Sequence, residues 1–306
     1  MGPGAIAAAH MRAHRAGGLT EPLWVVGPAQ EPAASFAGEW GFQHATADLA
    51  DALADDAVEL VLITSPNELH SPQALAALEA GKHVITEIPV AMHQDDAEAV
   101  AAKAEAVGRR ALVCHTMRSF PAVQGLRRQV ASGELTISQI NGFTATARRH
   151  NENWIGGTRE WVDNLLWHNS CHYLDMSLWV LGATEAENVC AQFGQPNPEY
   201  GMKMDVCVSF RTPKTELVTY SGSYNVAAGT SHMLFVADQG LFTLERNQLT
   251  DEHGTEIYPG AEWADLLAQD AAMIESIASG GPSDFEVSSA LPVMRLLEAA
   301  QAWENR

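Results

Sequence analysis

The chain has 306 residues, a length that suits two domains of ordinary size, and hydrophobic residues make up 46% of it. No apolar run approaches the length of a membrane span. The formal net charge of −20 makes nucleic acid and anionic membrane surfaces poor partners. The four cysteines are scattered without a C-x-x-C pair, so neither a zinc site nor a disulfide framework is indicated. Because no signal-peptide pattern opens the chain either, we expect a cytoplasmic protein.

In the first third of the chain, short apolar runs alternate with helical patterns. The runs and the Ala-rich segments between them predict strands at 23–26, 58–64, 83–87 and 111–114, and helices at 72–80 and 94–107. Buried strands that alternate with helices are typical of a parallel sheet with helices on both faces. We therefore predict an α/β fold that begins with a dinucleotide-binding domain of Rossmann type over residues 1–118.

From about residue 120 the pattern changes to a run of strands with hairpin-like spacing. We expect helices at 121–132, 164–181, 262–279 and 288–303, and strands at 137–149, 187–194, 204–211, 215–225, 231–237 and 240–246. This predicts a second, α+β domain over residues 119–306 with an open, mostly antiparallel sheet, whose last helix packs back on the first domain. Such a sheet commonly buries one face against a partner, so we expect a homodimer or a higher homo-oligomer.

The residues Gly2-Pro-Gly4-Ala5-Ile6-Ala match the pattern G-x-G-x-x-A. The glycines allow a tight turn and a close approach of backbone to a pyrophosphate, which binds at the N-terminus of the following helix. We predict that Gly2, Gly4, Ala5 and Ile6 bind the cofactor; an ordinary glycine-rich turn is the alternative. The pattern normally follows a strand, so we also expect an apolar strand of about five to eight residues before Met1.

The second predicted strand ends in Val25-Val26-Gly27. In NAD-binding proteins a carboxylate near this position binds the ribose 2′-hydroxyl. Its absence here removes a repulsion against a 2′-phosphate and favours NADP as the cofactor. NAD is the alternative, with Gly27 serving only as a turn residue.

A second group of polar residues lies on the predicted helix at 164–181. His168, His172 and Asp175 have the spacing i, i+4 and i+7, which places them on one face of an α-helix. Two imidazoles and a carboxylate suit acid–base chemistry near neutral pH. A zinc site is one alternative, but the Glu of H-E-x-x-H is absent, and we predict no metal. The other alternative is a pair of buried histidines with a purely structural role.

Arginines form a third group. Arg118, Arg148 and Arg149 stand out in a chain with only 18 Lys and Arg residues. A guanidinium presents a planar fork that matches a carboxylate, so these residues are candidates for binding an anionic substrate. The alternative is a solvated surface position for each of them.

The segments 64–70 and 81–89 predict a strand, a turn, a helix and a strand that ends in Glu87-Ile88-Pro89. This layout resembles the Gfo/Idh/MocA family of nicotinamide-dependent oxidoreductases, whose signature at this place is Glu-Lys-Pro with a catalytic Lys. The resemblance implies that the cofactor is bound by Ser65, Pro66, Asn67, His70, Glu87, Ile88, Pro89 and His115. A polar turn with a helix cap is the alternative for Ser65 and Asn67.

The family also carries the pattern Asp-x-x-x-His-x-x-Asp. Here His172 matches its histidine, Asp175 its second aspartate, and His168 replaces its first. The resemblance implies that these three residues are catalytic. It further implies a substrate site made by Arg118, Arg148, Arg149, Asn151, Trp167 and His168.

The chain departs from the family pattern at Ile88, in place of the Lys, and at His168, in place of the first Asp. With these two departures it resembles a member of the family that acts in aromatic compound degradation. The implied reaction oxidises a carboxylated cyclic hemiacetal to a lactone by hydride transfer to NAD(P). A hemiacetal hydroxyl is more acidic than an ordinary alcohol, which makes a Lys at position 88 less necessary. The alternatives are a sugar or cyclitol dehydrogenase of the same family and a catalytically idle dinucleotide-binding regulator.

Overall fold

A computed structural model describes residues 1–148, 164–260 and 266–304. The chain divides into two compact units, of which the first comprises Met1–Cys114 with Ala264–Leu291 and the second His115–Trp263 with Pro292–Arg306. The chain leaves the first unit close to the boundary at residue 118 that the sequence predicts. It returns to that unit over residues 264–291, which the sequence analysis assigns to the second domain.

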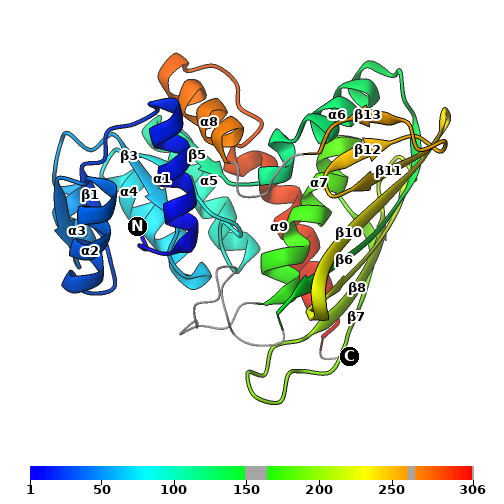
Figure 1. Cartoon of the computed structure of the whole chain (residues 1–306), viewed down its shortest axis with the longest axis horizontal. Helices are drawn as coiled ribbons and strands as arrows, with labels where there is room; N and C mark the ends of the chain where they lie inside the picture. The colour runs from blue at the N-terminus through cyan, green and yellow to red at the C-terminus, as the bar shows by residue number, and fades with distance from the viewer. Residues whose placement is uncertain (149–163, 261–265, 305–306) are drawn as a thin grey trace. The chain divides into compact units, whose positions relative to one another are not determined.

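The first unit is built on short parallel strands (Figure 1). These are β1 (Trp24–Val26), β2 (His44–Thr46), β3 (Leu60–Ile63), β4 (His83–Thr86) and β5 (Ala111–Val113). β1 pairs with β2, and β3, β4 and β5 form a three-stranded sheet; every pairing is parallel. The four apolar runs of the sequence correspond to β1, β3, β4 and β5, whereas β2 has no apolar run and is missed.

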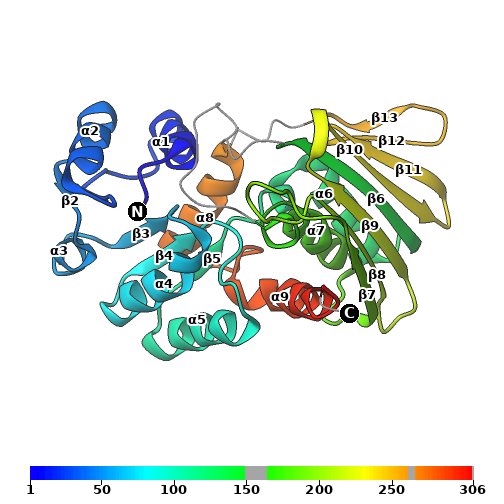
Figure 2. The same cartoon turned by 90° about the horizontal axis from the view of Figure 1, so that it is seen from below.

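Helices cover both faces of the three-stranded sheet, which confirms the predicted α/β class. The helices of the unit are α1 (Ala5–Gly17), α2 (Gln30–Trp40), α3 (Leu49–Leu53), the short 3₁₀ helix η1 (Asn67–Leu69), α4 (His70–Glu79), α5 (Gln94–Val107) and α8 (Leu267–Ser279), of which α2 and α3 pack against β1 and β2. Figure 2 shows α4 and α5 on one side of β3, β4 and β5, and α1 and α8 on the other. Met273 of α8 packs into one buried cluster with Ile85 and Leu112 of the sheet. None of the helices in the described ranges combines the length and apolar character that a membrane span requires.

A gap separates β1 from β3 in the first unit. In the described chain neither strand is paired on the side that faces the other. At one end of the gap, the Met1 amine donates to Leu62 O (2.5 Å), Thr64 N donates to Met1 O (2.8 Å), and Gly2 N donates to Val26 O (3.0 Å). One short segment thus bonds to both strands through its backbone, so the gap is one strand wide. Burial lowers the pKa of the Met1 amine to about 5.

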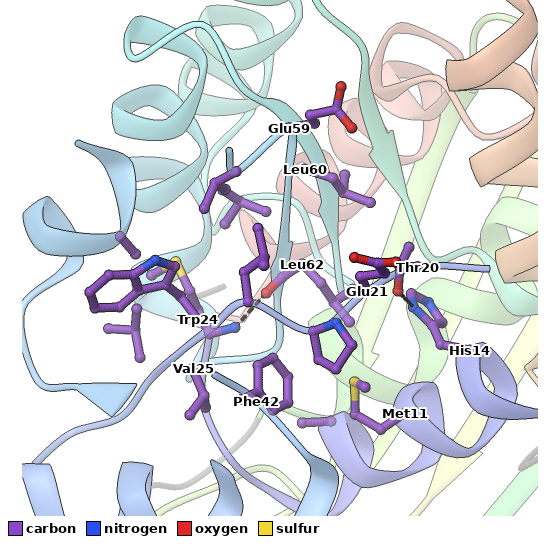
Figure 3. A pocket seen from close by; sticks show the side chains of 18 of the residues that line it. Met11, His14, Thr20, Glu21, Trp24, Val25, Phe42, Glu59, Leu60 and Leu62 are labelled. Atoms are coloured by element: carbon purple, nitrogen blue, oxygen red, sulfur yellow. Dashed lines mark hydrogen bonds between the residues drawn. The ribbon is translucent and has the colours of Figure 1, made fainter. Parts of the chain in front are cut away.

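Beyond Met1 the gap continues as a cavity of about 990 Å³ (Figure 3). Its walls carry apolar side chains from both strands and from the helical layer, among them Met11, Val25, Phe42, Leu60 and Leu62. The strand that the sequence analysis expects before Met1 stays a prediction.

The second unit contains an eight-stranded sheet with the order β13-β12-β11-β10-β6-β9-β8-β7. Its strands are β6 (Ile137–Ala147), β7 (Glu187–Phe193), β8 (Asp205–Arg211), β9 (Leu217–Ser223), β10 (Asn225–Ala237), β11 (Gly240–Glu245), β12 (Gln248–Thr250) and β13 (Glu256–Tyr258). All pairs are antiparallel except β6 with β9, so the prediction of a mostly antiparallel sheet is confirmed. The two short strands β12 and β13 are missed by the sequence analysis.

Helices lie along one face of this sheet (Figure 2). The helical segments of the unit are η2 (Thr116–Ser119), α6 (Pro121–Ser132), the π-helical turn η3 (Leu166–Ser170), α7 (Cys171–Leu181) and the part of α9 (Val287–Gln301) that follows Leu291. Along β10, Met233 and Phe235 are buried, whereas Leu234 and Val236 are exposed. This alternation is expected where one face of a strand lies against the core and the other points away from it.

Gly2 occupies a position that a larger residue would strain. Its φ is 84°, and a Cβ added to it would lie 2.6 Å from the backbone oxygen of Thr64. We expect Gly2→Ala to lower the free energy of unfolding by about 2 kcal/mol, because the backbone of Thr64 cannot give way as a flexible side chain can. Urea unfolding measures this change.

Gly4→Ala is the matched control. Gly4 has φ −107° and open space where a Cβ would stand, so this substitution should change the free energy of unfolding by less than about 0.5 kcal/mol. Equal stability of the two variants would show that the tight turn at Gly2 tolerates a side chain.

Candidate active site

The glycine-rich turn leads into the first turn of α1. Gly4 is the N-cap of this helix; it donates to Gly2 O (2.8 Å) and makes no side-chain cap bond. Backbone N–H groups at such a helix start, beside open space, suit a pyrophosphate. Ala5 begins the helix, and the side chain of Ile6 packs into a buried cluster with Ala9. The geometry at this turn therefore fits a dinucleotide.

His70 ties together the two loops that follow β3 and β4. Its Nδ1 lies 2.7 Å from Pro89 O and its Nε2 lies 2.8 Å from Ser65 O, and the side chain is buried. The first unit thus brings together seven of the predicted cofactor residues: Ser65, Pro66, Asn67, His70, Glu87, Ile88 and Pro89. Both ring nitrogens of His70 are engaged with the loops, so its contact with a cofactor stays a prediction while its support of the loops is observed.

The Glu87-Ile88-Pro89 turn combines a partly accessible carboxylate with a buried apolar side chain. The Glu87 side chain is 15% exposed, and Ile88 is 3% exposed. Glu87 Oε1 lies 2.9 Å from His10 Nε2, and Glu87 Oε2 accepts from Ile88 N (3.2 Å). The position of the family's Lys is therefore apolar and buried here, beside a carboxylate that a histidine holds.

His10 belongs to a buried polar network that the sequence analysis missed. Its Nδ1 lies 2.8 Å from Asp270 Oδ2 on α8. His14 Nε2 lies 3.3 Å from the same oxygen, and His14 Nδ1 lies 2.7 Å from Thr20 Oγ1. The one signal available in the sequence is the position of His10, which follows Ile6 by four residues and so lies one helical turn beyond the glycine-rich motif.

In this network the charge of His10 on α1 and the charge of Asp270 on α8 stabilise each other. Burial opposes protonation of His10, but the Asp270 charge and hydrogen bonds to Asp270, Cys114 and Glu87 raise its pKa well above the usual value. Burial likewise opposes ionisation of Asp270, but the charges and hydrogen bonds of His10 and His14 bring its pKa down to about 2. His10 is thus an imidazolium between two carboxylates.

In the second unit Arg118 and Asp175 form a buried bidentate pair. Arg118 Nε donates to Asp175 Oδ2 (2.8 Å) and Arg118 Nη2 donates to Asp175 Oδ1 (2.5 Å). Burial opposes ionisation of Asp175, but the charges of Arg118, His115 and His172 and the hydrogen bonds from Arg118 bring its pKa below the usual value. The pair links η2 to α7. The substrate-binding role of Arg118 and the catalytic role of Asp175 stay predictions.

His115 and His172 complete this cluster. His115 Nδ1 lies 3.3 Å from Asp175 Oδ2. Burial lowers the pKa of His115 to about 3, against the charge of Asp175 and with the help of the positive charges of Arg118 and His172. His115 is therefore neutral near pH 7 and lies in the second unit, beside residues for which the sequence predicts a catalytic or substrate-binding role.

His168 lies in a segment that departs from the predicted helix. The sequence predicts one continuous α-helix, but Leu166–Ser170 form a π-helical turn and α7 begins only at Cys171. The prediction of one continuous α-helix over 164–181 is therefore wrong at Leu166–Ser170, where the turn is wider. The prediction that His168 shares a face with His172 and Asp175 stays a prediction. His172 and Asp175 both lie in α7 and keep their spacing.

The remaining predicted substrate residues differ in their surroundings. Arg148 is 8% exposed at the end of β6, with its guanidinium 5.1 Å from the ring centroid of Tyr224. Trp167 is buried and donates its Nε1 to Gln301 Oε1 (3.1 Å), as a core residue does. Arg149 and Asn151 lie outside the described residues. Substrate binding by Arg148 and Trp167 stays a prediction.

Within the described ranges, two groups of side chains have the chemistry of metal ligands. They are His10 with His14 and Asp270, and His10 with Glu87 and Cys114. In both groups His10 bonds directly to a carboxylate, at 2.8 Å and 2.9 Å, so the donors face one another and not a common centre. The prediction that the chain binds no metal remains untested.

The neutral state of His115 has a consequence for acid stability. In the unfolded chain His115 takes up a proton near pH 6.5, whereas in the folded chain it does so only near pH 3. Its contribution to stability is therefore present above pH 6.5 and is lost as the pH falls towards 3. Between pH 7.5 and pH 5 this amounts to about 2 kcal/mol.

We expect His115→Gln to remove that dependence. Urea unfolding of the wild type and the variant at both pH values measures it, and the control is His253→Gln, at an exposed position. An unchanged pH dependence in His115→Gln would show that His115 is protonated in the folded chain.

The fold and the site define a class of protein: a nucleotide-binding unit of Rossmann type, followed by a unit with a mostly antiparallel sheet. In that second unit His115, Arg118 of η2 and Asp175 of α7 form a buried cluster. Family comparisons agree with this class. The profile described as "Oxidoreductase family, NAD-binding Rossmann fold" (Gfo/Idh/MocA) matches residues 1–115, and "Bacterial oxidoreductases, C-terminal" matches residues 121–259. The chain belongs to the Gfo/Idh/MocA oxidoreductase family.

Two relatives of the chain show that the family includes dehydrogenases named for different substrates. The chain is 37% identical to 4-carboxy-2-hydroxymuconate-6-semialdehyde dehydrogenase of Sphingobium sp. (strain NBRC 103272 / SYK-6), over 67% of this chain and 64% of that protein. It is 26% identical to an NADP(+) scyllo-inositol 2-dehydrogenase of Bacillus subtilis (strain 168), over 62% of this chain and 53% of that protein. The matched parts span less than two thirds of either relative.

Solved structures share the fold over nearly the whole chain. Levoglucosan dehydrogenase in complex with NADH and L-sorbose gives a TM-score of 0.86 at 19% identity, over 99% of this chain and 95% of that one. An oxidoreductase domain protein from Kribbella flavida gives 0.83 at 21% identity, over 98% and 94%. These similarities confirm the predicted fold class.

Proposed function

We propose that the protein is an NAD(P)-dependent dehydrogenase that oxidises a carboxylated cyclic hemiacetal to a lactone. The substrate would be of the 4-carboxy-2-hydroxymuconate-6-semialdehyde type, the product 2-pyrone-4,6-dicarboxylate, and the setting aromatic compound degradation. One observation carries the proposal: His172 lies in the first turn of α7, three residues before Asp175, whose buried carboxylate accepts two hydrogen bonds from Arg118. A histidine at this position suits proton transfer.

The first unit would hold the cofactor. The turn at Gly2 and Gly4 and the start of α1 suit the pyrophosphate, and the carboxylate of Glu87 suits a ribose hydroxyl. The turn after β1 carries Gly27 where NAD-binding proteins have a carboxylate, which supports NADP as the preferred cofactor over NAD. When bound, a nicotinamide supplies the hydride acceptor.

The second unit would accept the proton of the substrate hydroxyl and bind the substrate carboxylates. His172 accepts the proton of the hemiacetal hydroxyl as general base, with His168 as the alternative base. Arg148, which is stacked near Tyr224 at the end of β6, presents a guanidinium to a carboxylate. Arg118 already meets Asp175 with two hydrogen bonds, so we assign it the role of holding Asp175 and the cluster around it.

Turnover by the His172→Ala variant tests this proposal. With the semialdehyde and NADP we expect the wild type to reduce the cofactor, and His172→Ala to lose about 10²–10⁴-fold in kcat while keeping its cofactor affinity. His253→Ala is the control, since its side chain is 77% exposed. Full turnover in His172→Ala would remove this residue from the mechanism.

The same assay distinguishes the alternatives. Relatives named for sugar and cyclitol oxidation favour a second candidate, a dehydrogenase of neutral polyols. Such an enzyme would turn over a sugar panel and be indifferent to Arg148→Ala, whereas our proposal expects that variant to raise the KM for the semialdehyde. Cofactor binding without turnover of any of these substrates would identify an idle regulator.

We further propose that the exposed face of the eight-stranded sheet binds a second copy of the chain. The strand register places five apolar side chains on this face, each 36–51% exposed: Phe143, Leu217, Leu234, Val236 and Leu241. The ion pair between Arg211 and Glu187 at its margin is locally neutral. In a chain of net charge −20, such a face is where two copies can meet with least repulsion.

Val236→Glu should weaken this association by at least about tenfold, because it buries a charge at an apolar contact. Sedimentation velocity over a concentration series measures it. The control is Val107→Glu on α5, where the wild-type side chain is exposed to a similar degree, 38% against 37% for Val236. A monomeric wild type, or equal effects of the two variants, would contradict the assignment of this face.

A further inference from the structure

His10 is the only side chain in the described residues shown to bond both to the Glu87-Ile88-Pro89 turn and to α8. It comes from α1, its Nε2 faces Glu87 Oε1 at 2.9 Å, and its Nδ1 faces Asp270 Oδ2 at 2.8 Å. The imidazole is fully buried, so no water competes for either nitrogen. The contact with Glu87 spans 77 residues of sequence and the contact with Asp270 spans 260.

Two contacts, one with His10 and one with the backbone of Ile88, restrict the Glu87 carboxylate. His10 engages one carboxylate oxygen and Ile88 N engages the other, at 3.2 Å. A carboxylate oxygen has two lone pairs, so each keeps room for one more donor. The side chain is 15% exposed and can therefore still be reached. A carboxylate held in this manner is oriented before any ligand arrives, so binding loses less conformational entropy.

We propose that His10 is a positioning residue for cofactor binding. Its Nε2–H holds the Glu87 carboxylate in the orientation that accepts a ribose hydroxyl of NAD(P), and Asp270 fixes the ring through Nδ1. The inference rests on the proposed function, because it requires that Glu87 contacts the cofactor. Asp270 and His14 then support His10. His14 Nε2 lies 3.3 Å from Asp270 Oδ2, and His14 Nδ1 lies 2.7 Å from Thr20 Oγ1.

Two substitutions separate the two nitrogens of His10. The side-chain amide of Asn reaches the position of Nδ1, so His10→Asn keeps a donor towards Asp270 and loses the one towards Glu87. The longer Gln reaches the position of Nε2, so His10→Gln keeps the donor towards Glu87 and loses the one towards Asp270. Both replace an imidazolium by a neutral amide, so both are expected to destabilise the fold, and each serves as the matched control of the other.

Fluorescence titration with NADPH and NADH gives the Kd of each variant, and urea unfolding gives its stability. Removing a hydrogen bond to a charged group changes affinity by about tenfold. We expect His10→Asn to raise the Kd by about that factor and His10→Gln to stay within about threefold of the wild type. In a Glu87→Ala background, His10→Asn should produce no further change in Kd.

The outcomes are distinguishable. A merely structural role for His10 predicts loss of stability in both variants with the Kd of the folded protein unchanged, or equally changed; either result would overturn the positioning role. An effect of His10→Asn that persists in Glu87→Ala would also overturn it. If the wild-type protein bound neither NADPH nor NADH, that result would contradict the proposed function itself and therefore also the positioning role.

Discussion

Each unit of this protein buries a carboxylate and neutralises it with a cation from a different segment of the chain. In the first unit His10 of α1 stands between Glu87 and Asp270; in the second, Arg118 of η2 holds Asp175 of α7. Leaving a buried carboxylate without its partner costs several kcal/mol, so these cations are obligatory. The chain has 18 Lys and Arg against 38 Asp and Glu, and it still places a guanidinium where it is 1% exposed. The positions of the helices that carry these groups depend on the two pairings.

The two clusters use the same residue type in opposite protonation states. His10 has two carboxylates as partners, and although burial opposes its protonation, the Asp270 charge and the hydrogen bonds raise its pKa. His115 also meets a carboxylate, but Arg118 already neutralises Asp175, so burial prevails and lowers the pKa of His115 to about 3. The partners of His10 in the first unit therefore favour its charged form. In the second unit His115 lies beside a carboxylate whose charge Arg118 balances, so it stays neutral near pH 7.

The sequence predicts the parts of the fold that rest on local patterns. The strands β3, β4 and β5 are apolar because both faces of their sheet are covered, so each reads as an apolar run, and β1 gives the same signal in its pair with β2. β2 is the short segment His44–Thr46, partly exposed, and gives no such signal. The parallel pairing of β6 with β9 joins strands about 80 residues apart, and the sequence of neither strand shows a pattern that predicts it. The π turn at Leu166–Ser170 is likewise invisible, because the residues within it suit an α-helix equally well.

For the candidate site too, the sequence shows the residues that stand in local motifs and does not show the pairs that the fold brings together. The glycines, the Glu87-Ile88-Pro89 turn and His172 stand in motifs with fixed spacing, which a sequence shows directly. His10 and Asp270 are 260 residues apart, and neither lies in a pattern that points to the other. Arg118 stands out in the sequence as a candidate ligand of the substrate, but its hydrogen bond to Asp175, 57 residues away, appears only in the fold. Long-range pairing, which only the fold brings about, decides the role of each buried charge.

Ile88 is best understood through these pairings. In the family's usual signature a Lys stands here, next to the glutamate, and would add a second cation beside the imidazolium of His10. In this chain the neighbouring carboxylate is balanced by His10, and Ile88 is buried at 3% exposure. The first unit therefore offers no cation at position 88 to lower the pKa of a reacting hydroxyl, and our proposal assigns the proton transfer to His172. A substrate hydroxyl that is already acidic, as in a hemiacetal, needs least help of this kind. The absence of a Lys at position 88 is thus consistent with the hemiacetal substrate that we propose.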